Sequence, residues 1–112
     1  MGTSNILFTP LTVKAANGNT YLTPIRCYSY WELNAFISCT AIAGATTLNA
    51  SIETYDDYTG LWWVLANFTQ IVAAPALEMR LVLAGLGENV AVRWVFTGAG
   101  PATFSISGVL KG

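Results

Sequence analysis

Short runs in which apolar and polar residues alternate, separated by turn-forming residues, constrain this fold more than any other feature. A period of two predicts β-strands, because successive side chains of a strand point to opposite faces. The predicted strands are residues 6–13, 27–42, 46–55, 61–68, 77–83, 89–97 and 103–110, with at most a short one at 20–23. Turn residues stand at 17–19, 56–60 and 85–89, and residues 71–76 read as a loop. Seven or eight strands in 112 residues predict a single all-β domain, an antiparallel β-sandwich of jelly-roll or immunoglobulin-like Greek-key type.

Three of these segments carry further expectations. Pro10 lacks a backbone donor, so residues 6–13 should form an edge strand or a strand broken by a bend. Residues 76–81 are all good helix formers and follow Pro75, so a helix is an alternative there, although the neighbouring strands favour a strand. In the run 27–42 the odd positions form the apolar set, which predicts a core position for Trp31; Trp94 is predicted in the core as well.

Charge is unusually scarce in this chain. Charged residues make up 10% of it against about 25% in an ordinary soluble domain, while hydrophobic residues make up 54%. With a net charge of −1 and no basic cluster, nucleic-acid binding is not expected. Apolar stretches are broken by Gly, Pro, Asn and Thr, so no membrane-spanning helix is expected. A monomer this poor in charge would struggle to stay dispersed, which predicts that part of its exterior faces another protein.

The chain has few residues of the types that enzymes and metal sites use. The chain has no histidine, which removes imidazole-based triads and most zinc sites, so neither catalysis nor a cofactor is expected. Cys27 and Cys39 both fall on the apolar parity of one predicted strand, about 40 Å apart if it runs straight, and are expected to be buried free thiols. Glu53, Asp56 and Asp57 stand near a hairpin tip and would offer carboxylate ligands to a calcium ion, but the favoured role of Asp at such a turn is to accept hydrogen bonds from the backbone amides.

Trp62 and Trp63 are the residues most relevant to binding. Neighbours in a strand face opposite ways, so one indole should enter the core and the other should lie outside, near Tyr55 or Tyr58. An outward Trp is typical of a contact surface for a protein or a saccharide ring. We expect protein contact first, partial burial under a loop second and sugar binding third.

Four motifs in the second half of the chain resemble a known class of proteins. They are an acidic turn followed by Gly and Trp (residues 52–62), Phe-Thr-Gln (68–70), VRWVFTG (92–98) and FSISGVLKG (104–112). Together they resemble small β-sandwich virion proteins of tailed bacteriophages, which are encoded among head and tail genes. The resemblance implies a non-enzymatic structural protein of the virion, located on the capsid surface or in the head-tail region. It implies most directly a capsid decoration (cement) protein.

Such a role sets expectations for partners and contact residues. Proteins of the decoration class commonly form trimers and clamp neighbouring capsid subunits, so the major capsid protein, other virion proteins and further copies of this chain are the expected partners. The first ten residues are a candidate arm, with Ile6, Leu7 and Phe8 as contact residues beside Trp62, Trp63, Tyr55 and Tyr58. The alternative is a carbohydrate- or receptor-binding module of a phage tail or fibre. It would use Trp62, Tyr55 and Tyr58 as a stacking platform and Asp56 and Asp57 as hydroxyl acceptors.

Overall fold

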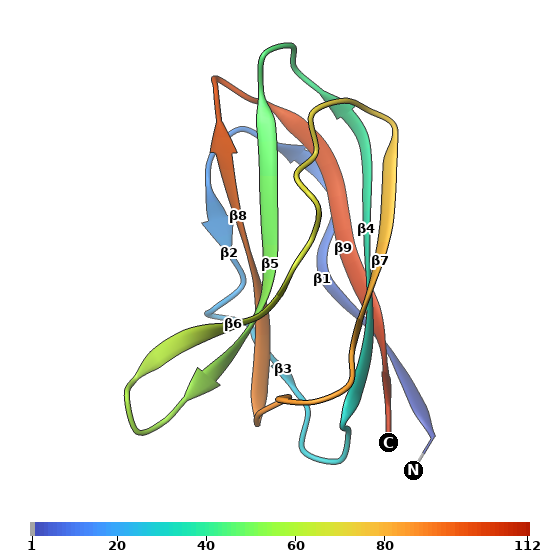
Figure 1. Ribbon diagram of the computed structural model, residues 1–112, viewed down its shortest axis with the longest axis vertical. Coiled ribbons are helices and arrows are strands. Elements are labelled where there is room, and N and C mark those ends of the chain that lie inside the picture. Colours follow the sequence, from blue (N-terminus) through green and yellow to red (C-terminus); the bar gives the residue numbers. More distant parts are fainter. Residues whose placement is uncertain (1) are drawn as a thin grey trace.

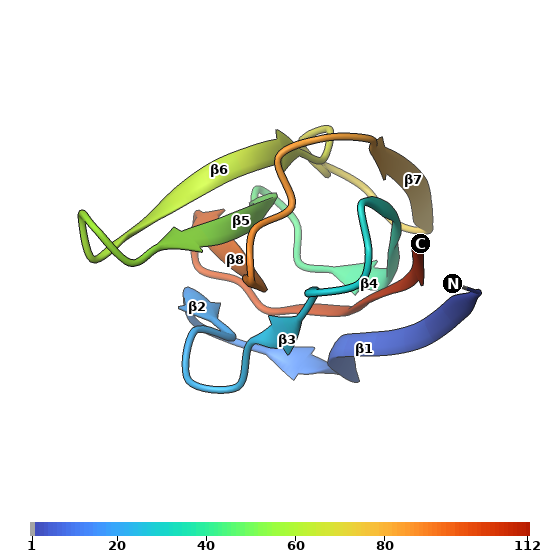
Figure 2. The ribbon, with the colours of Figure 1, turned by 90° about the horizontal axis from the view of Figure 1, so that it is seen from below.

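The computed structural model describes residues 2–112, which form two antiparallel β-sheets packed face to face (Figures 1 and 2). The strands are β1 (Thr3–Lys14), β2 (Gly18–Asn19), β3 (Ile25–Arg26), β4 (Glu32–Ile42), β5 (Thr47–Asp56), β6 (Leu61–Asn67), β7 (Ala76–Val82), β8 (Asn89–Thr97) and β9 (Ala102–Lys111). These residues contain no helix. The predicted all-β sandwich is therefore confirmed, and the helical alternative at residues 76–81 is wrong because this segment is β7.

The chain winds back and forth between the two sheets. The first sheet has the order β1-β9-β4-β7, and the second has the order β2-β8-β5-β6, with β3 also paired to β8. In Figure 2 the sandwich is seen along its length, with β1 and β7 at opposite edges of the first sheet. Within the first sheet no two neighbouring strands are consecutive in the chain, so most of its contacts are long-range.

The core is made by the inner faces of both sheets. Its fully buried side chains include Phe104, Leu33, Ile37, Leu48, Ile52, Ile106, Leu110, Val90, Val92, Cys27 and Cys39. These positions confirm the alternation predicted for residues 33–39, 48–52, 90–94 and 104–110. Trp94 is also buried, as predicted, and its indole Nε1 donates a hydrogen bond of 3.0 Å to the carbonyl oxygen of Ala16.

The predicted strand 27–42 is shorter than expected, and this changes the position of Trp31. β4 begins only at Glu32, while the preceding β3 pairs with β8 in the other sheet. The chain crosses between the sheets in a turn in which the amide of Tyr30 donates to the carbonyl of Cys27 at 3.1 Å. The alternation of β4 therefore does not extend to Trp31, whose side chain is 72% exposed; its predicted core position is wrong.

Residues 17–23 also differ from their prediction. The expected turn contains β2, and the expected short strand at 20–23 is a turn in which the amide of Thr23 donates to the carbonyl of Thr20 at 3.1 Å. β2 lies directly over Trp94, since a Cβ atom placed on Gly18 would be 2.5 Å from the indole ring. Only glycine allows the strand to approach the ring so closely.

β1 is an edge strand with irregular pairing, as Pro10 predicted. Its register with β9 shifts between Leu7 and Thr9 and again between Thr9 and Thr12. The ammonium of Lys14 occupies this irregular region: it donates to the carbonyl oxygens of Phe104 and Pro10, both at 2.9 Å. Residues 3–7 and Thr9 of the candidate arm pair with β9 of their own chain, so they complete the sheet of their own sandwich. The first residue of that arm, Met1, lies outside the described residues.

Both cysteines are buried free thiols, as expected. They lie in different parts of the core, because Cys27 follows β3 whereas Cys39 belongs to β4. Burial raises the pKa of both thiols, that of Cys27 to about 11. At neutral pH neither is a nucleophile, which makes both cysteines part of the packing.

Candidate functional site

The β5–β6 hairpin carries most of the aromatic residues singled out by the sequence. It projects beyond the rest of the sandwich in both views (Figures 1 and 2). Trp62 and Tyr55 are directly opposite each other in the β5–β6 pairing, with ring centroids 5.2 Å apart. Because this part of the hairpin is not covered by the opposite sheet, neither Trp62 nor Trp63 enters the core. The expectation that one of the two indoles would do so is wrong.

Trp62 is instead half-buried on the outer face of the second sheet. Its ring stacks on that of Tyr21, with centroids 4.6 Å apart and planes within 6° of parallel. Tyr21 reaches it from the turn after β2, a contact between distant parts of the chain that the sequence does not reveal. One face of the Trp62 indole is thus occupied within the molecule, and the ring is only partly available to a partner.

Trp63 and Tyr58 are the exposed rings of the hairpin. Trp63 is 52% exposed, and its Nε1 donates a 3.2 Å hydrogen bond to the hydroxyl of Thr59 in the turn. Tyr58 is fully exposed at the tip. Both indoles therefore lie outside the core, and Trp63 is the more exposed of the two.

The acidic residues of this region separate into different roles. The carboxylate of Asp56 accepts hydrogen bonds from the amides of Tyr58 and Thr59 and from the Thr59 hydroxyl, and these bonds lower its pKa. Asp56 thus stabilises the turn through these hydrogen bonds, which is the role that the sequence favoured. Glu53 lies away from the tip and is almost completely buried. Among residues 2–112 no three acidic or cysteine side chains gather where a metal ion would bind.

Glu53 forms a buried polar contact that the sequence did not single out. One carboxylate oxygen accepts a 2.5 Å hydrogen bond from the Tyr21 hydroxyl, and the other accepts a 2.9 Å hydrogen bond from Ser51. Burial, followed by the hydrogen bond and charge of Glu53, raises the pKa of Tyr21 to about 12. The hydrogen bond between Tyr21 and Glu53 holds the turn that places Tyr21 over the ring of Trp62, and it thereby stabilises the outer surface of the hairpin.

Replacement of Tyr21 by phenylalanine should lower the free energy of unfolding by about 1–2 kcal/mol, because the buried carboxylate of Glu53 loses a donor. The stabilisation from Tyr21 is present below its ordinary pKa of 10 and is lost as the pH rises to about 12. Urea unfolding at pH 7 and at pH values between 10 and 12 measures both effects. Tyr58→Phe is the control and should change stability by less than about 0.5 kcal/mol. Equal curves for Tyr21→Phe and wild type would contradict this role.

Of the three predicted contact residues near the N-terminus, two are at least partly buried and one is exposed. Phe8 is buried in the core, and Ile6 is partly buried against it. The prediction that Ile6 and Phe8 contact a partner is therefore wrong: β1 pairs within its own sheet, and both side chains pack in or against the core. Leu7 remains exposed and lies opposite Ser107 on the outer face of the first sheet.

A larger apolar surface lies on that outer face. We name the outer face of the first sheet the β7-sheet face; its large exposed side chains include Leu7, Val13, Phe36, Leu77, Met79 and Leu81. The positions between them are small or uncharged: Asn5, Asn34, Ser38, Ser105, Ser107 and Val109. Among the residues that the structure describes, the charged pair of this face is Glu32 with Lys111, 3.4 Å apart at one end. The sequence placed all charges of β7 on one side but did not show that the leucines face outward.

The charged side of β7 points to the edge of the sandwich. The Glu78 carboxylate accepts hydrogen bonds from the amide and hydroxyl of Thr69, at 2.7 and 3.1 Å, and Arg80 donates to the carbonyl of Asn67 at 2.9 Å. Glu78 and Arg80 also form an ion pair of 3.0 Å. These contacts tie β7 to the end of β6 and to the segment that follows it. The two charged side chains thus cover one edge of the sandwich, and Leu77 and Met79 remain on the outside.

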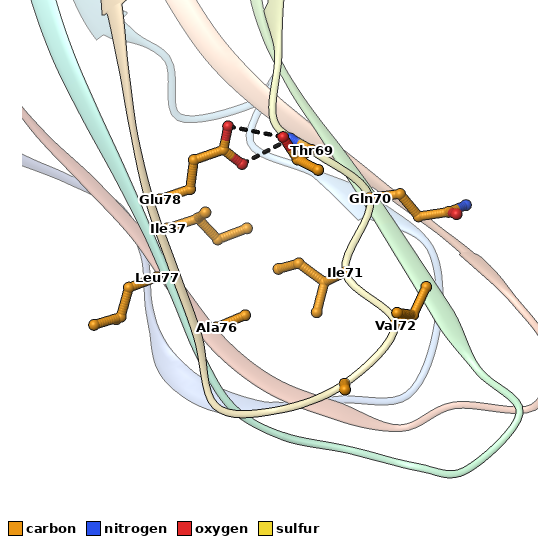
Figure 3. Close-up of a pocket in the computed structure, with 9 residues that line it drawn as sticks. Ile37, Thr69, Gln70, Ile71, Val72, Ala76, Leu77 and Glu78 are labelled. Atoms are coloured by element: carbon orange, nitrogen blue, oxygen red, sulfur yellow. Dashed lines mark hydrogen bonds between the residues drawn. The ribbon is translucent and has the colours of Figure 1, made fainter.

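A cavity of about 420 Å³ lies beside this closure, between β7 and the loop after β6. Figure 3 shows Ile37, Ile71 and Ala76 around its interior, while Leu77 points away from it toward the outer face. Among its polar lining residues, Glu78 and Thr69 are hydrogen-bonded to each other, and the side chain of Gln70 points away from the interior (Figure 3). The cavity thus offers an apolar recess and shows no arrangement of a nucleophile and a base.

Comparison with known proteins does not extend these observations. No protein-family model matches the chain, and no curated protein matches it. Across residues 2–112 the structure has no helix of the length and apolarity needed to cross a membrane. The conclusions on function therefore depend on the surfaces described above.

Proposed function

We propose that this chain is a non-enzymatic structural protein of a tailed-phage virion, most specifically a capsid decoration protein that stabilises the shell through protein–protein contacts. The observation that carries the proposal is the presence of two separate apolar surfaces, the β7-sheet face and the projecting hairpin, on a chain with 10% charged residues. A decoration protein needs two such surfaces, one for the shell and one for neighbouring copies. A ligand that binds only the assembled shell makes that shell harder to open.

The hairpin supports contact with the shell. Trp63, Tyr58 and Leu61 are exposed on an element that stands out from the sandwich, so they can enter a groove between capsid subunits (Figure 1). Aromatic residues dominate the energetics of protein interfaces when they fill a pocket on the partner. The stacking of Tyr21 on Trp62 holds the base of the hairpin in place and limits the entropy lost on binding.

Two measurements test the proposal. In purified virions that contain the chain, its copy number in a stained gel should be comparable to that of the capsid protein; a few copies per particle would reject decoration. Binding to shells stripped of the chain should weaken by about tenfold or more in Trp63→Ala. Trp31→Ala is the matched control, because Trp31 is also exposed but lies outside the hairpin. Equal binding of both variants would reject the hairpin as the anchor.

A carbohydrate- or receptor-binding module of a tail or fibre is the second candidate. The observation in its favour is that Trp63 and Tyr58 expose their rings next to the exposed Asp57. The platform expected from the sequence is reduced, however, because Trp62 is covered by Tyr21 and Asp56 is bonded to the turn. A reproducible glycan-array hit that Trp63→Ala abolishes would favour this function over decoration.

The order of the strands supports the jelly-roll form of the sandwich. An immunoglobulin-like sandwich places consecutive strands side by side within its first sheet. Here the first sheet has the order β1-β9-β4-β7, in which no neighbours are consecutive, and only β5 and β6 are consecutive neighbours in the path of the second. This interleaving is what winding a long antiparallel ribbon into two Greek keys produces.

A further inference from the structure

We propose that the β7-sheet face binds the same face of a second copy of this chain across a two-fold axis that runs parallel to the strands, between β4 and β9. The proposal rests on the proposed function and deepens it, because it names the partner of the surface that does not contact the shell. Three observations lead to it: the size of the face, the complementarity of its rows of side chains and the position of its charged pair.

The face is large enough for a small specific interface. The large apolar side chains named above for this face are between 38% and 80% exposed. If each can bury about 100–200 Å², they offer on the order of 400 Å² together. The intervening Ser, Asn and Val109 positions bring the face toward the roughly 600–1,000 Å² that each partner contributes to a standard interface. An uncharged surface of this kind also suits a self-contact, because no like charges meet at its centre.

The register of the sheet shows which side chains such an axis would bring together. Residues directly opposite one another share a face, and one row across the sheet reads Met79, Phe36, Ser107, Leu7 from β7 to β1. Rotation about an axis between β4 and β9 reverses this order in the second copy. Met79 then lies over the partner's Leu7, and Phe36 lies over the partner's Ser107. A large side chain meets a small one at the centre, and apolar side chains meet at the edges.

The charged end of the face follows the same symmetry. Glu32 of β4 and Lys111 of β9 are direct neighbours in register. Because the axis exchanges β4 with β9, Glu32 of one copy lies over Lys111 of the other, and opposite charges meet. A two-fold axis perpendicular to the strands would bring this charged end over the opposite, uncharged end of the partner's face. Glu32 and Lys111 are already paired within one chain, at 3.4 Å, and only the strand-parallel axis adds a second counter-charge from the partner to each of them.

The oligomeric state of the purified chain tests the proposal. Sedimentation and light scattering after size-exclusion chromatography should give a dimer at micromolar concentration. Leu77→Glu places a charge in the contact and should weaken dimerisation by about 100-fold or more. Leu22→Glu makes the same change at a leucine that is 96% exposed in the turn after β2 and should leave the dimer intact. A monomeric or trimeric wild-type chain, or equal effects of the two variants with unchanged circular dichroism, would overturn the proposal.

A short bismaleimide cross-linker tests the direction of the axis. It should join Met79→Cys to Leu7→Cys in a heterodimer, since these positions face each other between copies across the roughly 10 Å that separates packed sheets. Met79→Cys alone should not cross-link, because the two β7 strands lie at opposite edges of the contact, roughly three strand spacings of about 4.8 Å apart. Cys27 and Cys39 are buried and do not interfere. Efficient cross-linking of Met79→Cys with itself would overturn the strand-parallel axis.

These outcomes are separable from those of the proposed function. A chain that is monomeric in solution yet abundant in virions would overturn the two-fold contact and leave decoration standing. A dimer with the expected cross-links that is present in only a few copies per virion would support the contact and reject decoration.

Discussion

Phe104→Ala should lower the free energy of unfolding by about 3–5 kcal/mol, the range expected for deleting a fully buried aromatic ring. Phe104 has no exposed surface and lies at the centre of the core. Its ring meets those of Trp94 and Phe96 edge to face, with centroids 5.6 and 6.4 Å away. The ammonium of Lys14 lies 4.4 Å from the ring centroid, so the substitution also removes a cation–π contact.

Phe36→Ala is the matched control, because it makes the same change on the outer face of the same sheet. Phe36 is 38% exposed, and its loss should lower stability by only about 1 kcal/mol. Both variants are best compared by urea denaturation in the Leu77→Glu background, so that association at the β7-sheet face does not add to the measured value. Equal losses in the two variants would contradict the assignment of the core to the inner faces of the sheets. In the wild-type background Phe36→Ala should weaken dimerisation, whereas Phe104→Ala should act through folding.

The interior of the fold was predictable from the sequence because burial follows the alternation within each strand. Leu33, Ala35, Ile37 and Cys39 are buried where their parity placed them. Parity fails at Trp31, because the chain leaves one sheet for the other before β4 begins. A period of two records which residues share a face of one strand, and it contains no information on where the chain changes sheets.

The exposure of the outer residues was less predictable, because it depends on which other elements of the fold cover each face of a strand. Trp62 and Trp63 do point to opposite faces of the hairpin, but the hairpin extends past the opposite sheet, so that sheet covers neither of them (Figure 1). In β7 the rule of opposite faces separates Leu77 and Met79 from Glu78 and Arg80. The charged side chains form hydrogen bonds with the end of β6 and the segment after it, and the apolar ones remain on the outside. Those partners are distant enough in the chain that no local pattern identifies them.

Gly108→Ala is expected to lower the free energy of unfolding by about 3 kcal/mol, at the upper end of the range for overpacking a core. Gly108 lies in β9, which is flanked by β1 and β4, and its register partners are Ile6 and Ala35. A Cβ atom there would lie 2.8 Å from the backbone oxygen of Asn34 and 2.9 Å from Leu33 Cδ1. Backbone in a central ladder cannot move without loss of hydrogen bonds, and Leu33 is itself fully buried. A glycine within a strand marks such a close approach.

Gly44→Ala is the control for this substitution, because a Cβ atom at Gly44 would meet no atom within 4 Å. It should change stability by less than about 1 kcal/mol, and in the favourable direction if the turn accepts alanine without strain. Urea denaturation of both variants measures the difference, and a loss in Gly108→Ala no larger than that in Gly44→Ala would contradict the close packing of β9 on β4. The neighbours of Gly108 in the chain, Ser107 and Val109, lie on the β7-sheet face. Any shift of β9 that relieves the clash therefore also displaces the centre of the proposed two-fold contact, and Gly108→Ala should weaken dimerisation without changing a residue of that face.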